Sequence, residues 1–375
     1  MKIGFDAKRI YLNNTGLGSY SRNLVNALNK YAPQTDITLF TTERSGISKK
    51  EFDDSTFHVI SPSGFWSKRF KSLWRRKTIG KLAAKEKLDI YHGLSNEIPV
   101  NIQKQGVKSV VTIHDLIFMR YPKWYPSVDR RFYEKKIRQA VKDADKIICV
   151  SSSAKKDLIE FTAADEKKIS VIPPSVHPQF YNEPEWHVRN YLVNTYNLQS
   201  RFILNVASFT ERKNQLTLLK AYKLLTEKMS DVELVLIGDG KEYRQQVVQY
   251  IKENNLLNKV QMIDNCSTER LTAFYRLASL FVYPSLYEGF GMPVSEAMYS
   301  RVPVVVSRNS CFEETAGPSA IYIDAQNEKE LADAMMQVLD NPREGVRMAD
   351  ENFKYAQQFA DKPVIAQLSK LYATL

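Results

Sequence analysis

The sequence predicts an α/β protein made of two successive domains, each a doubly wound parallel sheet. The chain has 375 residues, which is too long for one ordinary hydrophobic core and suits two. Short apolar, β-branched runs alternate with amphipathic helical segments, an order typical of parallel βαβ units. This rhythm stops near residue 182 and restarts at residue 202. We therefore expect a first domain over residues 1–180, a linker over 181–200 and a second domain over 201–356.

The expected strands are apolar runs with turn residues at both ends. Those of the first half cover residues 2–7, 37–42, 57–61, 89–92, 109–114, 146–151 and 169–174. Those of the second half cover residues 202–208, 232–240, 259–265, 280–285, 302–307 and 320–324. Helical segments such as 19–31 and 130–144 separate them, and the chain from about residue 343 is helical. In open parallel sheets ligands bind beyond the carboxyl ends of strands, so polar residues in those loops are the candidate site residues.

The composition is that of a soluble globular protein, with 43% apolar and 25% charged residues. No apolar run approaches the length of a membrane span, and the amino terminus lacks the ordered parts of a secretory signal. Cys149, Cys266 and Cys311 show no paired spacing, so neither a disulfide framework nor a zinc site is indicated. These features favour a reducing, cytoplasmic location.

The net charge of +11 is concentrated in residues 65–87, which hold nine Lys or Arg against one Glu. Aromatic residues recur there at helical spacing, a pattern typical of an amphipathic helix lying on an anionic membrane. The alternative is a solvated helix whose aromatic side chains pack on the domain. Nucleic acid is not expected as a partner, because no recognition element accompanies the charge. The candidate membrane or acceptor residues are Trp66, Lys68, Arg69, Trp74, Arg75 and Arg76.

The stretch YEGFGMPVSE, residues 287–296, follows the strand run 280–285 and is the strongest candidate site. Its two acids, Glu288 and Glu296, flank a Gly-Phe-Gly turn that leads into a helix started by Pro293. Free amides at a helix start bind anionic or hydroxylated ligands, and a carboxylate beside them can accept bonds from vicinal hydroxyls. Acids that only complement the helix dipole are the alternative. The residues expected to bind a ligand here are Glu288, Gly289, Phe290, Gly291, Met292 and Glu296.

Two further strand ends carry polar residues of interest. Arg212 and Lys213 are adjacent cations beyond the first strand of the second half, where a departing diphosphate would need positive charge. Cations near a helix start are unfavourable without an anion, which argues against a role as mere solvated charge. His114 ends the strand run 109–114 and Asp115 follows it, although a lone histidine is more often a satisfied core residue.

Two other patterns are weak. Gly16 and Gly18 form a G-x-G expected as a loop between the first strand and first helix, but the third glycine of a dinucleotide fingerprint is missing. Nicotinamide binding is therefore not expected, and the loop fits approach of backbone to a phosphate or sugar. Asp143 and Asp145 have the D-x-D spacing of some metal sites but precede a strand, so no metal is expected.

Taken together, the motifs resemble the retaining GT-B glycosyltransferases of family GT4, also called glycosyl transferases group 1. The segments that carry the resemblance are GLGSYSRNL, TIHDL, VSSSAKKDL, VIPPSVHPQF, SFTERKNQ and TERLTAFYRLASLFVYPSLYEGFGMPVSEAM, which span nearly the whole chain. The resemblance implies two Rossmann-like domains facing across a cleft, with the acceptor held by the first and a nucleotide sugar by the second. It also implies that the final helix, about 357–375, crosses back onto the first domain.

The resemblance implies roles for individual residues. Glu296 is expected to bind the donor ribose, and Glu288 the hydroxyls of the transferred sugar. Arg212 and Lys213 would hold the diphosphate. The remaining expected contacts are backbone contacts from Gly289, Phe290 and Gly291, a sugar contact from His114 and a phosphate contact from Gly18. One departure is that Ala207-Ser208 stands where many relatives carry Gly-Arg, which leaves the phosphate charge more dependent on Arg212 and Lys213.

These roles define an expected reaction. The acceptor hydroxyl attacks on the side from which the diphosphate departs, the leaving phosphate takes the proton, and Glu288 positions the ring without forming a covalent bond. The resemblance to bacterial mannosyltransferases favours GDP-mannose as donor, with a UDP-sugar as the alternative, and a glycan or lipid-linked acceptor at the inner face of the plasma membrane. An epimerase or phosphorylase on the same scaffold, or a carbohydrate-binding protein without turnover, remain open.

Overall fold

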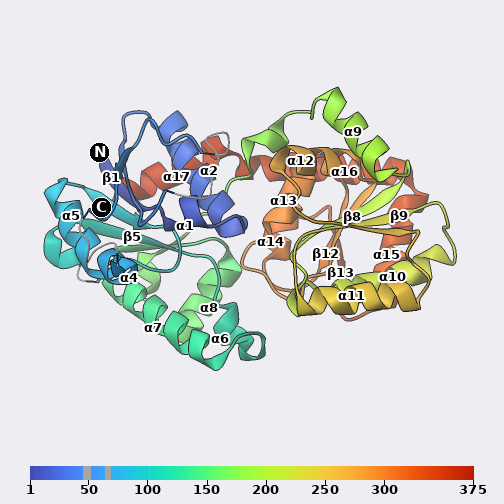
Figure 1. The fold of residues 1–375 in the computed structure, drawn as a ribbon, viewed down its shortest axis with the longest axis horizontal. Helices are drawn as coiled ribbons and strands as arrows, with labels where there is room; N and C mark the ends of the chain where they lie inside the picture. Colours follow the sequence, from blue (N-terminus) through green and yellow to red (C-terminus); the bar gives the residue numbers. More distant parts are fainter. Residues whose placement is uncertain (45–51, 64–68, 101) are drawn as a thin grey trace. The chain divides into compact units, whose positions relative to one another are not determined.

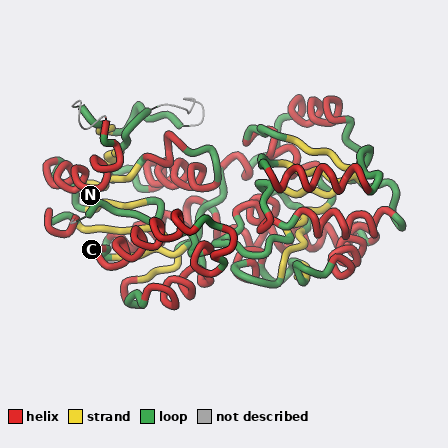
Figure 2. The backbone as a smooth tube through the Cα atoms, turned by 60° about the horizontal axis from the view of Figure 1, so that its bottom comes forward, coloured by secondary structure: helices red, strands yellow, loops and turns green. Residues whose placement is uncertain are grey.

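The computed structural model describes residues 1–44, 52–63, 69–100 and 102–375. The chain divides into two compact units (Figure 1). The first comprises Met1–Ser175 with Phe359–Leu375, and the second comprises Val176–Gln358. Each unit is built on its own parallel sheet, and helices lie on both sides of the strands in each (Figure 2).

The first unit contains a seven-stranded sheet in the order β3-β2-β1-β4-β5-β6-β7. Its strands are β1 Lys2–Asp6, β2 Asp36–Phe40, β3 His58–Ile60, β4 Ile90–Gly93, β5 Lys108–Ile113, β6 Lys146–Cys149 and β7 Ile169–Val171. Its helices are α1 Lys8–Leu12, α2 Gly16–Tyr31, α4 Lys71–Leu73, α5 Ile79–Lys85, α6 Ile117–Arg120, α7 Ser127–Asp143, α8 Ser152–Thr162 and α17 Asp361–Tyr372. Every pairing in this sheet is parallel.

The central strands of the first unit are buried on both faces. In β5 all residues after Lys108 are buried, which explains why the sequence shows a continuous apolar run there and no alternation. The core of the unit gathers residues from β1, α2 and β2, together with five residues of α17, namely Val364, Ile365, Leu368, Leu371 and Tyr372. Helix α17 therefore belongs to the first unit, although it follows the whole of the second in sequence.

The second unit contains a six-stranded sheet in the order β10-β9-β8-β11-β12-β13. Its strands are β8 Phe202–Val206, β9 Glu233–Ile237, β10 Val260–Ile263, β11 Leu280–Tyr283, β12 Val304–Ser307 and β13 Ile321–Ile323. Its helices are α9 Trp186–Tyr196, α10 Gln215–Thr226, α11 Glu242–Glu253, α12 Thr268–Leu277, α13 Met292–Tyr299, α14 Phe312–Ala316, α15 Glu328–Asp340 and α16 Pro342–Ala356. The two halves of the sheet meet at β8 and β11, which are direct neighbours.

The structure confirms the predicted fold class of two α/β units with parallel sheets, and every predicted strand is present. The stretch 181–200 differs from the expected linker, because it contains α9 and lies within the second unit. The ring of Tyr196 in α9 packs on Phe274 of α12, and Arg270 lies over the ring of Tyr191. Aromatic contacts with α12 thus hold this helix, which the broken strand rhythm did not indicate.

The basic stretch 65–87 also differs from the single amphipathic helix that its spacing predicts. Trp66 and Lys68 lie outside the described residues. The described part runs through α4, a π-helical turn η1 at Trp74–Thr78, and α5. Trp74 is only 4% exposed, so its ring packs inside the first unit and cannot contact a lipid surface. For Trp74 the packed alternative is therefore correct. Arg69, Phe70 and Arg76 are exposed.

Among the described residues, no helix has both the length and the apolarity needed to cross a membrane. Within that part of the chain, no cluster of three or more His, Cys, Asp or Glu side chains is arranged to hold a metal ion. Cys149, Cys266 and Cys311 are free cysteines.

Candidate active site

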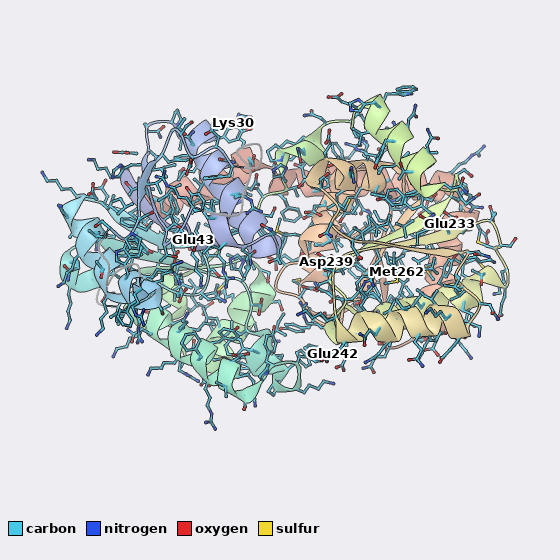
Figure 3. The ribbon with its side chains drawn as sticks, viewed as in Figure 1. Lys30, Glu43, Glu233, Asp239, Glu242 and Met262 are labelled. Carbon is cyan, nitrogen blue, oxygen red and sulfur yellow. The ribbon has the colours of Figure 1, made fainter. Side chains whose placement is uncertain are left out.

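The carboxyl end of the second sheet carries a cluster of charged side chains. Figure 3 labels Glu233 at the start of β9 and Asp239 just beyond its end, which identifies the edge of the sheet at which these loops lie. Arg212 and Lys213 form a short 3₁₀ turn, η6 Glu211–Lys213, beyond β8, and Glu288 lies in the loop after β11. Because β8 and β11 are neighbours, the three side chains meet although 75 residues separate Lys213 from Glu288.

Glu288 is the centre of this cluster and is only 8% exposed. Its Oε1 accepts a hydrogen bond from Lys213 Nζ, lies 2.7 Å from an Arg212 guanidinium nitrogen, and accepts a 2.7 Å bond from Ser285 Oγ. The Tyr283 hydroxyl also donates to it at 3.4 Å. Glu288, Arg212 and Lys213 together carry one positive charge in excess, which is available to an anionic ligand.

The protonation states in the cluster follow from these partners. Burial alone would raise the pKa of Glu288, but the charges of Lys213 and Arg212 outweigh it and hold this pKa at about 2. Burial lowers the pKa of Lys213, and the Glu288 carboxylate acts in the opposite direction. Glu288 is therefore an ionised acceptor of hydrogen bonds at physiological pH.

Backbone contacts hold the two loops of the cluster together. The carbonyl of Arg212 accepts bonds from Leu286 N at 2.8 Å and from Ser285 Oγ at 3.1 Å. Asn214 adopts a left-handed conformation with φ of 62°, and its Nδ2 donates to the carbonyls of Pro284 and Ala325. Hydrogen bonds thus join the two loops that carry the side chains of the site, and such fixed loops are a requirement for a pre-organised site.

The Gly-Phe-Gly turn leads directly into α13, as the sequence predicts. Gly291 has φ of +84°, a conformation that disfavours a side chain, and Met292 is the first residue of the helix. Pro293 occupies the first turn, where its missing N–H costs nothing. Phe290 is buried, and its carbonyl accepts a bond from Thr315 Oγ1 in α14. The amides at the start of α13 therefore lie in the same loop as Glu288.

Glu296 lies one turn into α13 and differs from Glu288 in its environment. Although part of the residue is exposed, loss of hydration raises the pKa of its carboxyl to about 7. Its side-chain partner is the Tyr275 hydroxyl, which donates to Oε2 at 3.1 Å. A carboxyl held this way loses its proton readily when a ligand offers hydroxyl donors.

His114 and Gly18 are in the first unit. His114 Nε2 donates to the Leu94 carbonyl at 2.8 Å, and burial lowers the pKa of the ring to about 4, so the ring is neutral at physiological pH. Gly16 and Gly18 lie in the first turn of α2 and not in a loop before a helix. A Cβ on Gly18 would lie 1.8 Å from the Asn13 carbonyl oxygen, so close backbone packing alone requires glycine there.

Asp145 has a structural environment. Its Oδ2 accepts bonds from the Ser109 backbone N at 2.8 Å and from Ser109 Oγ at 2.9 Å, which ties the starts of β5 and β6 together. The other acid of the D-x-D pattern, Asp143, is the last residue of α7.

Two family models match most of the chain. The model for glycosyltransferase family 4 matches residues 14–180, and the model for glycosyl transferases group 1 matches residues 193–356. The chain is a family 4 glycosyltransferase. The second match includes the whole Arg212, Lys213 and Glu288 cluster.

Relatives of this glycosyltransferase include mannosyltransferases. O-antigen chain mannosyltransferase B of Escherichia coli is 24% identical over an alignment that covers 100% of both chains. The MMP alpha-(1->4)-mannosyltransferase of Mycolicibacterium hassiacum is 28% identical over 73% of this chain and 67% of its own.

Solved structures show that this glycosyltransferase has the GT-B fold. A glycosyltransferase from Rickettsia africae superimposes with a TM-score of 0.79 at 18% identity, covering 100% of this chain and 98% of the other. Anabaena Alr3699/HepE, solved in complex with UDP, superimposes with a TM-score of 0.78 at 16% identity over 100% of both chains. At these identities the likeness establishes the fold alone.

Sequence reasoning missed several residues around the glycosyltransferase cluster. Ser285 and Tyr283 bond to Glu288, and the Glu288 backbone N donates to Ser310 Oγ at 3.0 Å. The pairing of Glu288 with Arg212 and Lys213 was missed as well. A prediction that the first and fourth strands of the second half are neighbours would have found it, because that adjacency brings the two loops together.

Proposed function

We propose that the protein is a retaining, metal-independent hexosyltransferase that moves mannose from a nucleotide-diphosphate sugar to a glycan or lipid-linked acceptor. The observation that carries this proposal is the Glu288, Arg212 and Lys213 cluster beside the start of α13. It offers an ionised carboxylate for sugar hydroxyls and two cations for a diphosphate, at the positive end of the α13 dipole. The cations supply the charge neutralisation that a metal provides elsewhere.

The proposed reaction needs no covalent intermediate. The bond between the anomeric carbon and the diphosphate oxygen breaks, and the acceptor oxygen bonds to that carbon on the same face. The acceptor proton passes to the departing diphosphate. The contacts from Lys213, Arg212 and Ser285 all fall on Oε1 of Glu288 and hold the carboxylate in one orientation, which supports a role in positioning the ring.

Capture of a covalent sugar adduct tests this role. The wild type and Glu288→Gln are incubated with a fluorinated donor and examined by intact-mass spectrometry. Neither protein should gain the mass of a sugar. A wild-type adduct that maps to Glu288 would contradict the proposed role and establish double displacement.

GDP-mannose is the donor that we favour, because relatives that match this chain are named as mannosyltransferases. A UDP-hexose is the alternative, since one structural neighbour was solved with UDP and with UDP-glucose. The two donors share the diphosphate and the ribose hydroxyls, so both suit the cluster. They differ in the base and in the hexose.

A panel of nucleotide sugars tests the function. Thermal stabilisation and slow hydrolysis are measured for the wild type and for Glu296→Ala, each with and without EDTA. One donor should stabilise the wild type and be hydrolysed equally with and without EDTA, and the variant should lose both effects. If no nucleotide sugar binds, the transferase proposal fails. If EDTA abolishes turnover, metal independence fails.

We also propose that the enzyme works in the cytoplasm at the inner face of the plasma membrane. Exposed apolar side chains alternate with cations on two elements of the first unit. These side chains are Phe70 and Leu73, followed by Val128 and Phe132 of α7, with Arg69, Lys71 and Arg131 beside them. Such a surface suits an anionic bilayer.

Co-sedimentation with phosphatidylglycerol vesicles tests this membrane surface. The fraction of protein that sediments should fall at least fivefold in Phe70→Ser/Phe132→Ser, and unchanged sedimentation would refute the proposed membrane contact.

A further inference from the structure

A polar pocket in the first unit contains Arg75 and Arg76, two of the candidate membrane or acceptor residues of the basic stretch. It lies where β1 and β4 end, between the π-helical turn η1 and helix α7. Its floor consists of four charged side chains: Asp6, Arg75, Glu97 and Lys136. Its volume open to water is about 80 Å³, enough for several water molecules and therefore for a phosphate with one edge of a sugar ring.

The four charged side chains at the floor of the pocket form one continuous chain of ion pairs. Arg75 donates to both Asp6 and Glu97, and Lys136 Nζ lies 2.5 Å from the second oxygen of Glu97. The charges of Arg75 and Lys136 outweigh burial and hold the pKa of Glu97 at about 2. Glu97 is thus ionised, and the oxygens of Asp6 and Glu97 retain lone pairs for further hydrogen bonds. Such oxygens accept hydrogen bonds from sugar hydroxyls.

The Arg75 guanidinium is fixed at the floor of the pocket by its bonds to Asp6 and Glu97. Its side chain is only 12% exposed, so these two bonds hold both carboxylates in place.

The rim of the pocket adds positive charge. Arg76 and Lys135 line it and are exposed, and neither has an ion-pair partner among the described residues. The floor is neutral because its two acids balance Arg75 and Lys136, so the rim cations give the pocket an excess of two positive charges. The ring of Phe132 and the buried Tyr91 form an apolar side. The pocket therefore combines acceptors for hydroxyls, an apolar wall and cations for an anion.

We propose that this pocket binds the phosphorylated sugar end of the acceptor. The phosphate lies between Arg76 and Lys135, and the ring hydroxyls donate to Asp6 and Glu97. A phosphate alone would face two carboxylates, and an uncharged sugar would leave both rim cations unused, so the pocket selects a ligand with both features. The word acceptor rests on the proposed transferase function, whereas the phosphosugar chemistry rests on the pocket alone.

Binding of soluble probes tests the proposal. Titration calorimetry measures mannose 1-phosphate, mannose and inorganic phosphate against the wild-type protein. Mannose 1-phosphate should bind at least tenfold more tightly than either of the other two. Equal affinity for inorganic phosphate would overturn the proposal and leave a simple anion site.

Two double variants compare the rim cations with cations outside the pocket. Arg76→Gln/Lys135→Gln removes two exposed cations and leaves the buried floor intact, so it should fold normally. Lys85→Gln/Lys142→Gln removes two exposed cations from α5 and α7, outside the pocket. The rim variant should bind mannose 1-phosphate at least tenfold more weakly, and the control within twofold of the wild type. An equal loss in both variants would overturn the proposal.

Two further measurements are needed. One distinguishes a lipid-linked ligand from a soluble one, and the other distinguishes failure of the pocket proposal from failure of the proposed transferase function. Phosphatidylcholine vesicles doped with a polyprenyl-diphosphate-linked hexose test a lipid-linked source, and mannose 1-phosphate tests a soluble one. Donor hydrolysis by water should be unchanged in the Lys85→Gln/Lys142→Gln control. If the wild type hydrolyses no nucleotide sugar, the transferase function fails, while the binding comparison still decides the pocket.

Discussion

At the residue scale, the two glutamates of the YEGFGMPVSE stretch have opposite electrostatic environments. Glu288 has a pKa of about 2 because Lys213 and Arg212 outweigh the effect of its burial. Glu296 has a pKa of about 7 because burial raises it and only the hydrogen bond from the Tyr275 hydroxyl lowers it. The same residue type, eight positions apart, thus gives one carboxylate that is always ionised and one that titrates near neutrality.

The first prediction concerns donor affinity and pH. Hydroxyl donors bind the ionised carboxylate, so wild-type affinity for the nucleotide sugar should fall as the pH drops below 7, approaching about tenfold per pH unit. Glu296→Gln should bind more weakly at pH 8 and show no such slope. Calorimetry between pH 6 and pH 8 measures both.

Two other groups that could titrate in this range are excluded from the measured pH dependence. An intact nucleotide sugar is used, because the terminal phosphate of a free nucleotide titrates near pH 6. His114, with a pKa of about 4, stays neutral over the range. The same slope in Glu296→Gln would show that another group is responsible.

The second prediction concerns the coupling within the charged cluster. Lys213→Gln should weaken donor binding by about tenfold to a hundredfold, because a charge-assisted contact to the diphosphate is lost. Glu288→Gln should lower turnover, and the effects of the two changes should not add. A double-mutant cycle on kcat/KM measures the coupling, which we expect to exceed about 1 kcal/mol. Strict additivity would contradict a functional cluster.

At the element scale, the start of α13 joins backbone geometry to the proposed donor site. The left-handed Gly291 ends the loop that carries Glu288, and the helix that carries Glu296 begins at the next residue. A single backbone conformation therefore sets the spacing between the two acids. In the first unit, the π-helical turn η1 has a comparable effect, since it places Arg75 inward on Asp6 and Glu97 and leaves Arg76 exposed.

The third prediction is that Gly291→Ala destabilises the second unit by about 1–2 kcal/mol. The added Cβ would lie 3.0 Å from the Phe312 ring, and the left-handed conformation disfavours a side chain. Donor affinity should fall as well, because the start of α13 must shift. Gly16→Ala is the control, because no atom lies within 4 Å of its Cβ position. Urea denaturation and donor titration measure both, and equal behaviour of the two variants would refute the argument.

At the scale of the whole molecule, the last helix completes the unit in which the chain began. Tyr372 in α17 is buried, and its hydroxyl lies 2.7 Å from His92 Nδ1 in β4. The other ring nitrogen of His92 is 2.8 Å from Thr112 Oγ1. Burial lowers the pKa of His92 to about 3, so the ring is neutral and needs both partners.

The fourth prediction tests this dependence. Tyr372→Phe should cost about 1–3 kcal/mol, because one ring nitrogen of His92 loses its partner. Hydrogen exchange resolved by peptide should show the loss in β4 and β5 and little change in the second unit. Tyr31→Phe, at an exposed position, is the control. Uniform destabilisation of both units would contradict the assignment of α17 to the first.

The sequence alone determined the strands, the two parallel sheets, the family and the candidate residues of the YEGFGMPVSE loop. These follow from local patterns: apolar periodicity, Gly-Phe-Gly before a proline, and polar residues at strand ends. The roles of Glu288, Glu296, Arg212, Lys213 and His114 in binding and transfer stay predictions.

Only the tertiary structure decided which of these residues meet. Strand order, which no local pattern encodes, brought Lys213 to Glu288 across 75 residues of chain. Packing turned Trp74 inward although its spacing suited a membrane face, because periodicity identifies the faces of a helix and not what covers them. The Asp6, Arg75 and Glu97 floor likewise joins three separate segments. Long-range contacts and burial, which set the pKa values of the site, arise only once the sheets have formed.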